Sequence, residues 1–294
     1  MKRIIFIQTF LSLLLSTVLC VVAYAKSEVK AKADIAVICS ASIDLQWEEK
    51  EQIKIKTPYG ATSDVITVGK VRGKRVAYMP RHGYKHTYAP HTVPYKANIW
   101  AFKQLGVKRI FSIQTVGSLQ PNIKPGEFVV IDQFVDRTSG RPATFFDGPD
   151  VAHLSAAYPF CSETRELAIK CAKELGITVH EKGTCVVIEG PRFSTCAESQ
   201  WFTNMGWHVV NMTLYPECIL AREQEICYSS VTLVTDYDSG IVAQGHVTPV
   251  THAEVGRVAA ENVEKSAKLL LSMIENIPDE QHCGCDHAMD GARL

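Results

Sequence analysis

Apolar runs of strand length alternate with segments of helical periodicity along most of the chain. Strands are predicted at residues 34–39, 65–71, 75–79, 109–115, 127–133, 186–189, 209–212 and 229–235. Helices are predicted at residues 95–105, 164–175, 216–224 and 251–275. Because strands alternate with helices, we expect an α/β fold with a mostly parallel sheet flanked by helices. No repeat and no Gly/Ser-rich linker divides residues 34–294, so we expect one domain there.

The N-terminal segment has a different pattern. A positive start at residues 2–3 precedes an apolar run at residues 4–22, and residues 23–25 supply the small–x–small pattern of a signal-peptidase site. We therefore predict a signal peptide at residues 1–25, a linker at residues 26–33, and export to a periplasm or the cell exterior. A single membrane anchor is the alternative, but the run carries five polar residues and is barely long enough to span a bilayer.

Composition and charge narrow the class of protein. Apolar residues make up 46% and charged residues 21% of the chain, which excludes intrinsic disorder and a multi-span membrane protein. The 31 basic residues balance the 31 acidic ones, and removal of Lys2 and Arg3 with the leader leaves a net charge of −2. With no basic excess to neutralise phosphates, nucleic acid is not an expected partner, and no membrane contact is expected after leader removal.

Small, hydroxyl-bearing and charged residues follow successive predicted strands. These strand-end segments are residues 39–42, 80–83, 114–118, 189–194, 211–213 and 235–238. In open α/β sheets ligands bind beyond the carboxyl ends of the strands, so we expect these segments to form one site. Each has a structural alternative: Asp236 and Asp238 are also residue types that cap helices or turns.

The motifs at these positions resemble those of the trimeric purine nucleoside phosphorylases. They read RHGYKH, NIWAFKQLG, VGSL, PGEFVVIDQFVDRTSGRP, FFDG, EGPRFSTCAES, NMTLYPE and TDYD. The 5′-methylthioadenosine phosphorylases are the most similar branch, and the resemblance runs from about residue 34 to 277. It implies a mixed β-sheet surrounded by helices, a homotrimer, and cleavage of a purine nucleoside by inorganic phosphate. Phosphate is then a co-substrate, with no other cofactor and no metal.

The resemblance implies a role for each of the two aspartates after the last strand. Asp236 would protonate N7 of the departing purine, because negative charge develops on the base as the glycosidic bond breaks. Burial is expected to raise the pKa of this carboxyl and keep a proton available near neutrality. Asp238 would accept from an exocyclic 6-amino group, and a 6-oxo base would instead place a carbonyl against the carboxylate. The pair therefore favours 6-aminopurines.

The resemblance also implies the other contacts of the site. The residues implied to bind the nucleoside are Thr115, Val116, Gly117, Phe193, Ser194, Met212 and His153. Among these, Phe193 walls the base, Met212 packs against the ribose and His153 reaches a neighbouring subunit near the 5′ group. The residues implied to hold phosphate are Arg81, His82, Thr213, Ser40 and Gln114.

Two phosphate-contact positions depart from the family pattern. The first loop of the family is Gly-Gly-Thr/Ser-Gly, and here it reads Cys39-Ser40-Ala41-Ser42; Gln114-Thr115 stands where Thr or Ser precedes Ala. Glycines there normally let the backbone approach phosphate closely. Three hypotheses follow: phosphorolysis of methylthioadenosine or adenosine, hydrolysis of the same nucleosides by water, and non-catalytic binding. Asp236 argues against the third, because a binder needs no leaving-group acid.

The segment at residues 239–250 suits a loop over the 5′ end of the nucleoside. It carries Ile241, Val242 and Val247, which favour the apolar thioether tail of methylthioadenosine, and adenosine stays open as a substrate.

Nine cysteines remain once Cys20 leaves with the leader. Cys283-Gly284-Cys285 is a single ligand pair, whereas zinc sites usually show two separated pairs, so we predict no metal. By resemblance, Cys161 and Cys227 form a disulfide, and Cys283 and Cys285 close a small ring. Cys39, Cys171 and Cys185 lie in apolar runs and are expected to be buried thiols.

Overall fold

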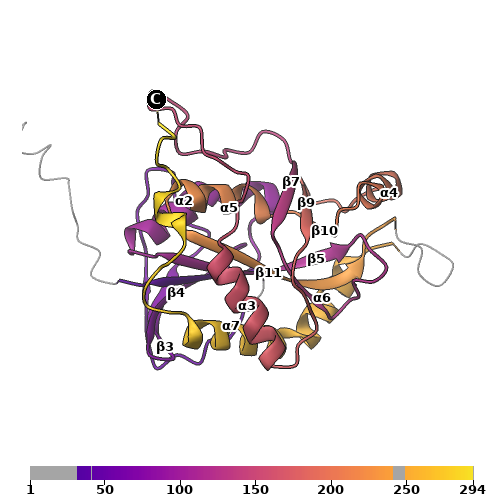
Figure 1. The fold of residues 1–294 in the computed structure, drawn as a ribbon, viewed down its shortest axis with the longest axis horizontal. Helices are drawn as coiled ribbons and strands as arrows, with labels where there is room; N and C mark the ends of the chain where they lie inside the picture. The colour runs from indigo at the N-terminus through magenta and orange to yellow at the C-terminus, as the bar shows by residue number, and fades with distance from the viewer. Residues whose placement is uncertain (1–31, 41, 241–248, 294) are drawn as a thin grey trace, which may run out of the picture. The chain divides into compact units, whose positions relative to one another are not determined.

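One sheet organises the part of the chain that the computed structural model describes, residues 32–40, 42–240 and 249–293 (Figure 1). The predicted leader, most of the predicted linker, Ala41 and residues 241–248 of the predicted 5′ loop lie outside the described residues. The strands are β1 (Ile35–Cys39), β2 (Glu49–Ile53), β3 (Ile66–Val71), β4 (Lys74–Pro80), β5 (Arg109–Ser118), β6 (Phe128–Val130), β7 (Gln133–Arg137), β8 (Val179–His180), β9 (Thr184–Ile188), β10 (Val209–Asn211) and β11 (Cys227–Tyr237).

The helices cover both faces of this sheet. They are α2 (Tyr95–Gln104), α3 (Ser162–Glu174), α4 (Cys196–Asn204), α5 (Leu214–Glu223), α6 (His252–Glu261) and α7 (Val263–Asn276), with 3₁₀ turns η1 (Pro90–Thr92) and η2 (Gly284–His287). Figure 1 shows α2 beside α5 on one side of the sheet and α3 beside α7 on the other. Among the described helices, none combines the length and apolarity that a membrane span requires.

The sheet branches at β5, its central strand. The first half of β5 pairs in parallel with β1, ending at Cys39 opposite Ile113, and its last residues pair antiparallel with β10. The other edge of β5 pairs in parallel with β11 along its whole length. Since β1 and β10 diverge between Ile113 and Gly117, the sheet opens along one edge of Gln114–Val116. A sheet that splits in this way leaves space for a ligand at the split.

The pairing confirms an α/β fold with a mixed sheet surrounded by helices. The sheet is mostly parallel, as the alternation of strands and helices predicts. The parallel pairs are β1–β4, β1–β5, β5–β11, β6–β8, β7–β9 and β9–β10, and the antiparallel pairs are β2–β3, β3–β4, β5–β10 and β6–β11. The strand β2 was not predicted. It is a largely exposed edge strand (EKEQI) and has no apolar alternation to reveal it.

The predicted helix over residues 251–275 is two helices. The chain breaks at Asn262, whose φ of −112° and ψ of 6° are not helical, and its Nδ2 donates to the Val258 carbonyl. Neither Gly nor Pro marks the break, so sequence periodicity runs through it. Because of the break, the two helices pack against different parts of the fold. The helix α6 packs beside β11, and α7 packs into the main hydrophobic core.

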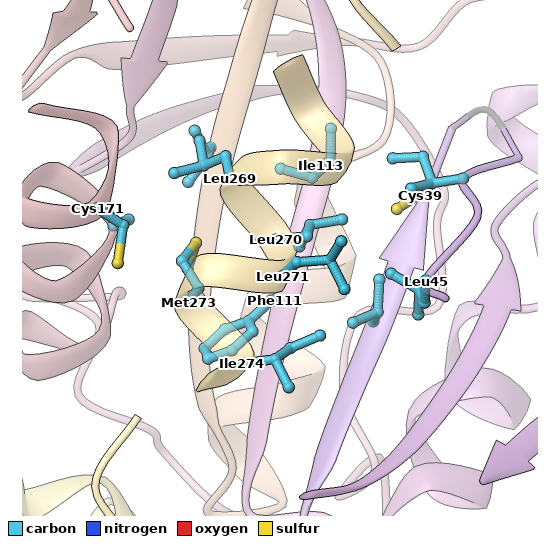
Figure 2. Packing of buried hydrophobic residues seen from close by; sticks show 14 of the residues in the cluster. Cys39, Leu45, Phe111, Ile113, Cys171, Leu269, Leu270, Leu271, Met273 and Ile274 are labelled. Carbon is cyan, nitrogen blue, oxygen red and sulfur yellow. The ribbon is translucent and has the colours of Figure 1, made fainter. Parts of the chain in front are cut away.

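The core between α7 and the sheet is shown in Figure 2. Leu269, Leu270, Met273 and Ile274 of α7 belong to the same buried hydrophobic cluster as Phe111 of β5. Full burial of each such side chain contributes about 1.5–3 kcal/mol relative to exposure. This packing holds the central strand rigid under the site at its carboxyl end.

The nine cysteines of the described residues are all free thiols. The predicted disulfide between Cys161 and Cys227 is therefore not formed in this structure, and neither is the predicted ring between Cys283 and Cys285. Instead, the sulfur atoms of these four residues lie within 4.8 Å of one another. The other three cysteines named above, Cys39, Cys171 and Cys185, are buried as predicted.

Candidate active site

A cavity of about 220 Å³ lies where the carboxyl ends of β1, β5, β10 and β11 meet. Predicted site residues that line it are Ser40, His82, Thr115, Val116, Gly117, Phe193, Ser194, Met212, Thr213, Asp236 and Asp238. The split of the sheet at β5 creates this opening, and α6 closes one side with His252 and Val255. The structure thus brings most of the predicted strand-end residues into one pocket.

A β-bulge sets the position of the first aspartate. The register between β11 and β5 shifts between Val234 and Asp236, so that Asp236 stands opposite Gly117. A Cβ atom at position 117 would lie 2.8 Å from Asp236 Oδ1 and 3.1 Å from Val210. Since real Cβ atoms do not approach oxygen so closely, only glycine leaves room for this carboxyl. Bulges are commonly placed where a strand must re-aim a side chain toward a site.

Burial decides the protonation of Asp236. Removal from water raises the pKa of its carboxyl to about 7, against an ordinary value of 3.8. The Thr235 hydroxyl, which donates to Asp236 Oδ2 at 2.7 Å, opposes that shift, and the charge of Asp238 adds to it. A carboxyl with a pKa near neutrality can hold a proton for a leaving group and release it.

The second aspartate is buried beside two serine hydroxyls. Asp238 is 2% exposed, and its backbone N–H donates to the Ser118 carbonyl. Burial raises the pKa of the Asp238 carboxyl, while the neighbouring hydroxyls of Ser199 and Ser194 oppose the rise. Asp238 Oδ2 and both hydroxyl oxygens lack a hydrogen bond of regular geometry with any described residue. Buried polar atoms of this kind normally have partners, so the group is suited to a polar ligand.

The apolar side of the pocket depends on a second glycine. Gly190 has a φ of +66°, and a Cβ atom there would lie 2.7 Å from Met212 Sδ. Met212 and Phe193 are half-buried and both line the cavity. An apolar wall in the same cavity as the carboxylates suits a ligand with a flat, aromatic part.

Arg81 lies behind the pocket rather than on its surface. Its guanidinium is fully buried and donates to both carboxylate oxygens of Glu217, at 2.7 and 2.8 Å. Nη1 also donates to Ser40 Oγ at 3.1 Å, and Ser40 lines the cavity. The charge of Glu217 raises the pKa of Arg81 against the opposing effect of burial. Arg81 is therefore a fixed positive charge directly behind Ser40.

Gln114 is also buried, in a hydrogen-bonded network with Arg81. Its Nε2 donates to the Ser112 and Tyr228 hydroxyls at 3.0 and 3.1 Å, and the Thr213 hydroxyl donates to its Oε1 at 3.2 Å. Ser112 Oγ in turn accepts from Arg81 Nη2 at 2.7 Å. Gln114 thus holds the pocket residue Thr213 in place from behind.

Three histidines gather at the same end of the pocket. The rings of His82 and His86 stack with centroids 4.4 Å apart, and His86 lies 6.1 Å from His252. Burial lowers the pKa of His82 to about 4. Its Nδ1 lies 2.8 Å from the Tyr88 carbonyl oxygen and must donate to it, so Nε2 of the neutral ring carries a lone pair. His82 can therefore accept a hydrogen bond from a protonated anion.

His153 is a predicted site residue that the structure does not bring into this arrangement. It is exposed, it does not line the cavity, and its backbone N–H donates to the Ala292 carbonyl at 2.8 Å. Its position is that of a surface residue of this chain.

Sequence analysis did not single out His252, Val255 or Glu217, which lie at the site or directly behind it. Thr235 lies in the predicted strand-end segment 235–238 and in the quoted motif TDYD, although no role was assigned to it. His252 follows a capping threonine at the start of α6, and nothing local connects it with the strand ends. Glu217 lies 136 residues from Arg81, and only the fold pairs them.

The chain belongs to the phosphorylase superfamily, whose family model matches residues 34–275. The S-methyl-5′-thioadenosine phosphorylase of Thermofilum pendens is 51% identical to it, over 86% of this chain and 94% of the relative. The enzyme of the same name from Pyrococcus abyssi is also 51% identical, over 85% and 95%. These matches confirm the resemblance that the motifs carry.

Solved structures agree with this assignment. A methylthioadenosine phosphorylase from an antarctic soil metagenomic library superposes with a TM-score of 0.84 at 37% identity, covering 90% of this chain and 93% of the other. A mutant adenosine/methylthioadenosine phosphorylase from Schistosoma mansoni, in complex with methylthioadenosine, gives a TM-score of 0.80 at 34% identity, covering 88% and 96%.

Proposed function

We propose that the protein cleaves 5′-methylthioadenosine with inorganic phosphate, giving adenine and a 5-methylthioribose 1-phosphate. The observation that carries the proposal is the geometry of one pocket. A carboxyl with a pKa of about 7 stands in the same cavity as a polar cluster containing His82, Ser40 and Thr213. The names of the curated relatives support the choice of nucleoside.

At the base end of the pocket, Asp236 donates its proton to N7 as the bond to the ribose lengthens. Asp238 accepts from the exocyclic amino group, with its unpaired buried oxygen as the acceptor. Phe193 and Met212 pack against the base and the ribose. General-acid assistance of this kind contributes about 10²–10⁴-fold to a rate.

At the other end, Ser40, Thr213 and His82 hold the phosphate oxygens. Arg81 acts through its charge and through Ser40, to which it donates at 3.1 Å. His82 Nε2 accepts from a protonated phosphate oxygen, because Nδ1 is committed to the Tyr88 carbonyl. Holding phosphate against the anomeric carbon turns a bimolecular attack into an oriented one.

A direct assay tests the nucleophile. Purified mature protein is incubated with methylthioadenosine at saturating phosphate and in phosphate-free buffer, and adenine release is followed. We expect release to require phosphate and to yield the sugar 1-phosphate. Adenine released equally fast without phosphate contradicts phosphorolysis and supports hydrolysis. The structural argument for hydrolysis is that two predicted phosphate ligands, Arg81 and Gln114, are hydrogen-bonded to Glu217 and Tyr228. Binding without release supports the non-catalytic alternative.

Asp238→Asn tests the choice of base. The substitution replaces an ionised acceptor by a neutral amide whose N–H groups face a 6-oxo oxygen favourably. A hydrogen bond to a charged group is worth about 1.5–3 kcal/mol, so we expect kcat/KM for adenosine, relative to inosine, to fall by about 10- to 100-fold. The measurement is the ratio of the two kcat/KM values in wild type and variant. An unchanged ratio would remove Asp238 from base selection.

We further propose that the chain works as an exported homotrimer. The charged start, apolar run and small–x–small site of residues 1–25 support export, and the mature chain would then begin at Lys26, which N-terminal sequencing tests. The family resemblance supports the trimer, in which His153 of one protomer completes the 5′ end of a neighbouring pocket.

A further inference from the structure

Four cysteines from three distant segments meet at one place, away from the nucleoside pocket. Cys161 directly precedes α3, Cys227 begins β11, and Cys283 and Cys285 belong to the segment after α7. Their sulfur atoms all lie within 4.8 Å of one another. Cys161, Cys227 and Cys285 are 2%, 0% and 8% exposed, and Cys283 is half-buried. None of them takes part in the proposed reaction.

The sulfur atoms lie too far apart for disulfide bonds and close enough together to surround one ion. Cys227 Sγ and Cys283 Sγ are 3.3 Å apart, well beyond the ~2.05 Å of a disulfide bond. Four thiolates arranged tetrahedrally at ~2.3 Å from a zinc ion stand about 3.8 Å from one another. The sulfur–sulfur distances of the cluster, 3.3 Å for one pair and at most 4.8 Å for any pair, lie on both sides of this value, so small side-chain movements would suffice to form the tetrahedron.

One hydrogen-bond donor and two cationic side chains lie around the sulfur atoms. Gln281 Nε2 donates to Cys227 Sγ at 2.9 Å, which is the kind of outer hydrogen bond that orients metal ligands. A surface cleft beside the cluster is lined by Cys161, Cys283 and Cys285 together with the cations Arg165 and Arg222 and the anion Asp132. The cleft gives an entry path, and the two arginines offset the charge of a tetrathiolate complex.

We propose that Cys161, Cys227, Cys283 and Cys285 bind one zinc ion as a structural site. Four soft thiolate ligands select a d¹⁰ ion such as Zn²⁺ over Mg²⁺ or Ca²⁺. On binding, each thiol loses its proton, so that one Zn²⁺ and four thiols give a dianionic complex and four protons. With all four positions filled by protein, the ion has no site for water or substrate, and its role is to hold chain segments together.

The segment that the ion would hold supports another part of the surface. Beyond Cys285 the chain reaches Ala292 and Arg293, which pair with Ala152 and His153. Arg293 also lies 3.6 Å from Asp150. The site would therefore anchor the C-terminal segment to α3 and β11, and through it the loop that carries His153.

Metal analysis of the full mature chain tests this proposal. Protein produced with zinc in the medium should contain about one zinc per chain by plasma mass spectrometry, as a closed four-ligand site requires. In Cys283→Ser/Cys285→Ser, zinc content should fall roughly tenfold or more. Cys196→Ser removes an exposed cysteine outside the cluster and should keep the wild-type content. A chelator should lower the melting temperature of the wild type and leave that of the double variant unchanged.

A second measurement needs no variant. Wild-type protein reconstituted with Co²⁺ should show sulfur-to-cobalt charge-transfer bands and the visible bands of tetrahedral Co²⁺. Zinc-free wild-type protein whose intact mass shows two disulfides among these four cysteines overturns the proposal. So does zinc content that the double variant retains, or a cobalt spectrum without sulfur ligation.

Discussion

Asp236→Asn should lower kcat for adenine release by about 10²–10⁴-fold while the protein stays folded. An amide has the shape of the carboxyl but no proton to give to the departing purine. Asp34→Asn, an exposed position outside the pocket, is the matched control and should keep wild-type turnover. The measurement is kcat with saturating methylthioadenosine and phosphate, with circular dichroism of both variants. Turnover retained in Asp236→Asn would remove this carboxyl from the acid role.

Because the pKa of Asp236 is about 7, we expect both the activity and the stability of the protein to depend on pH. As a general acid, Asp236 must be protonated, so wild-type activity should be present below pH 7 and fall as the pH rises above it. The stability of the folded protein also depends on the ionisation of Asp236. Because the pKa of this carboxyl in the folded state lies above the ordinary 3.8, its ionisation destabilises the folded state. This destabilisation is absent below pH 4, grows between about pH 4 and 7, and is constant above pH 7.

Asp236→Asn should therefore be more thermostable than wild type at pH 8, and the difference should shrink toward zero as the pH approaches 4. Melting temperatures across this range check the sign. A gain in stability that does not depend on pH would contradict burial as the cause of the raised pKa.

Removal of either partner of the buried ion pair should be the largest stability effect at the site. Arg81 and Glu217 are 0% and 1% exposed in their side chains and are joined by two hydrogen bonds. Arg81→Leu leaves a carboxylate, and Glu217→Leu a guanidinium, buried without its counter-ion. Each should cost about 3–5 kcal/mol in the free energy of unfolding, a large part of the stability of a typical domain. Urea unfolding measures it.

The double variant separates stability from phosphate binding. Arg81→Leu/Glu217→Leu removes both charges, and we expect it to be less destabilised than either single variant, with a residual cost of about 1–3 kcal/mol for the hydroxyls of Tyr228 and Ser112 that lose a partner. The KM of the double variant for phosphate should be higher than that of the wild type, because the positive charge of Arg81 is missing. A wild-type KM for phosphate in the double variant would show that Arg81 has only a structural role.

Much of the fold was predictable because the strands appear in the sequence as apolar runs and the site residues follow directly after them. β1, β3, β4, β5, β9, β10 and β11 lie close to the predicted apolar runs. All of them except β3 end in, or run directly into, a segment that lines or supports the pocket. The helix α4 was missed although its signal was present. Thr195 and Glu198 form a capping box at its start, which is readable in the sequence as Thr-x-x-Glu.

Other features had no local signal. The break at Asn262 is set by what α6 and α7 pack against, and residues 251–275 keep helical periodicity across it. The cysteine cluster joins positions up to 124 residues apart in the sequence, so spacing revealed only the pair at 283 and 285. The predicted disulfides are absent from the structure for the same reason: which sulfur atoms meet, and at what distance, depends on where three segments end in space.

The sequence by itself determined which chemical groups follow each strand and which family the chain belongs to, because those properties reside in short motifs. Tertiary structure alone decided the state of these groups. Burial sets the pKa of Asp236, a bulge and Gly117 position its carboxyl, and Glu217 turns Arg81 into a fixed charge behind Ser40. Desolvation and charge pairing depend on neighbours brought together by folding, and a linear pattern does not contain those neighbours.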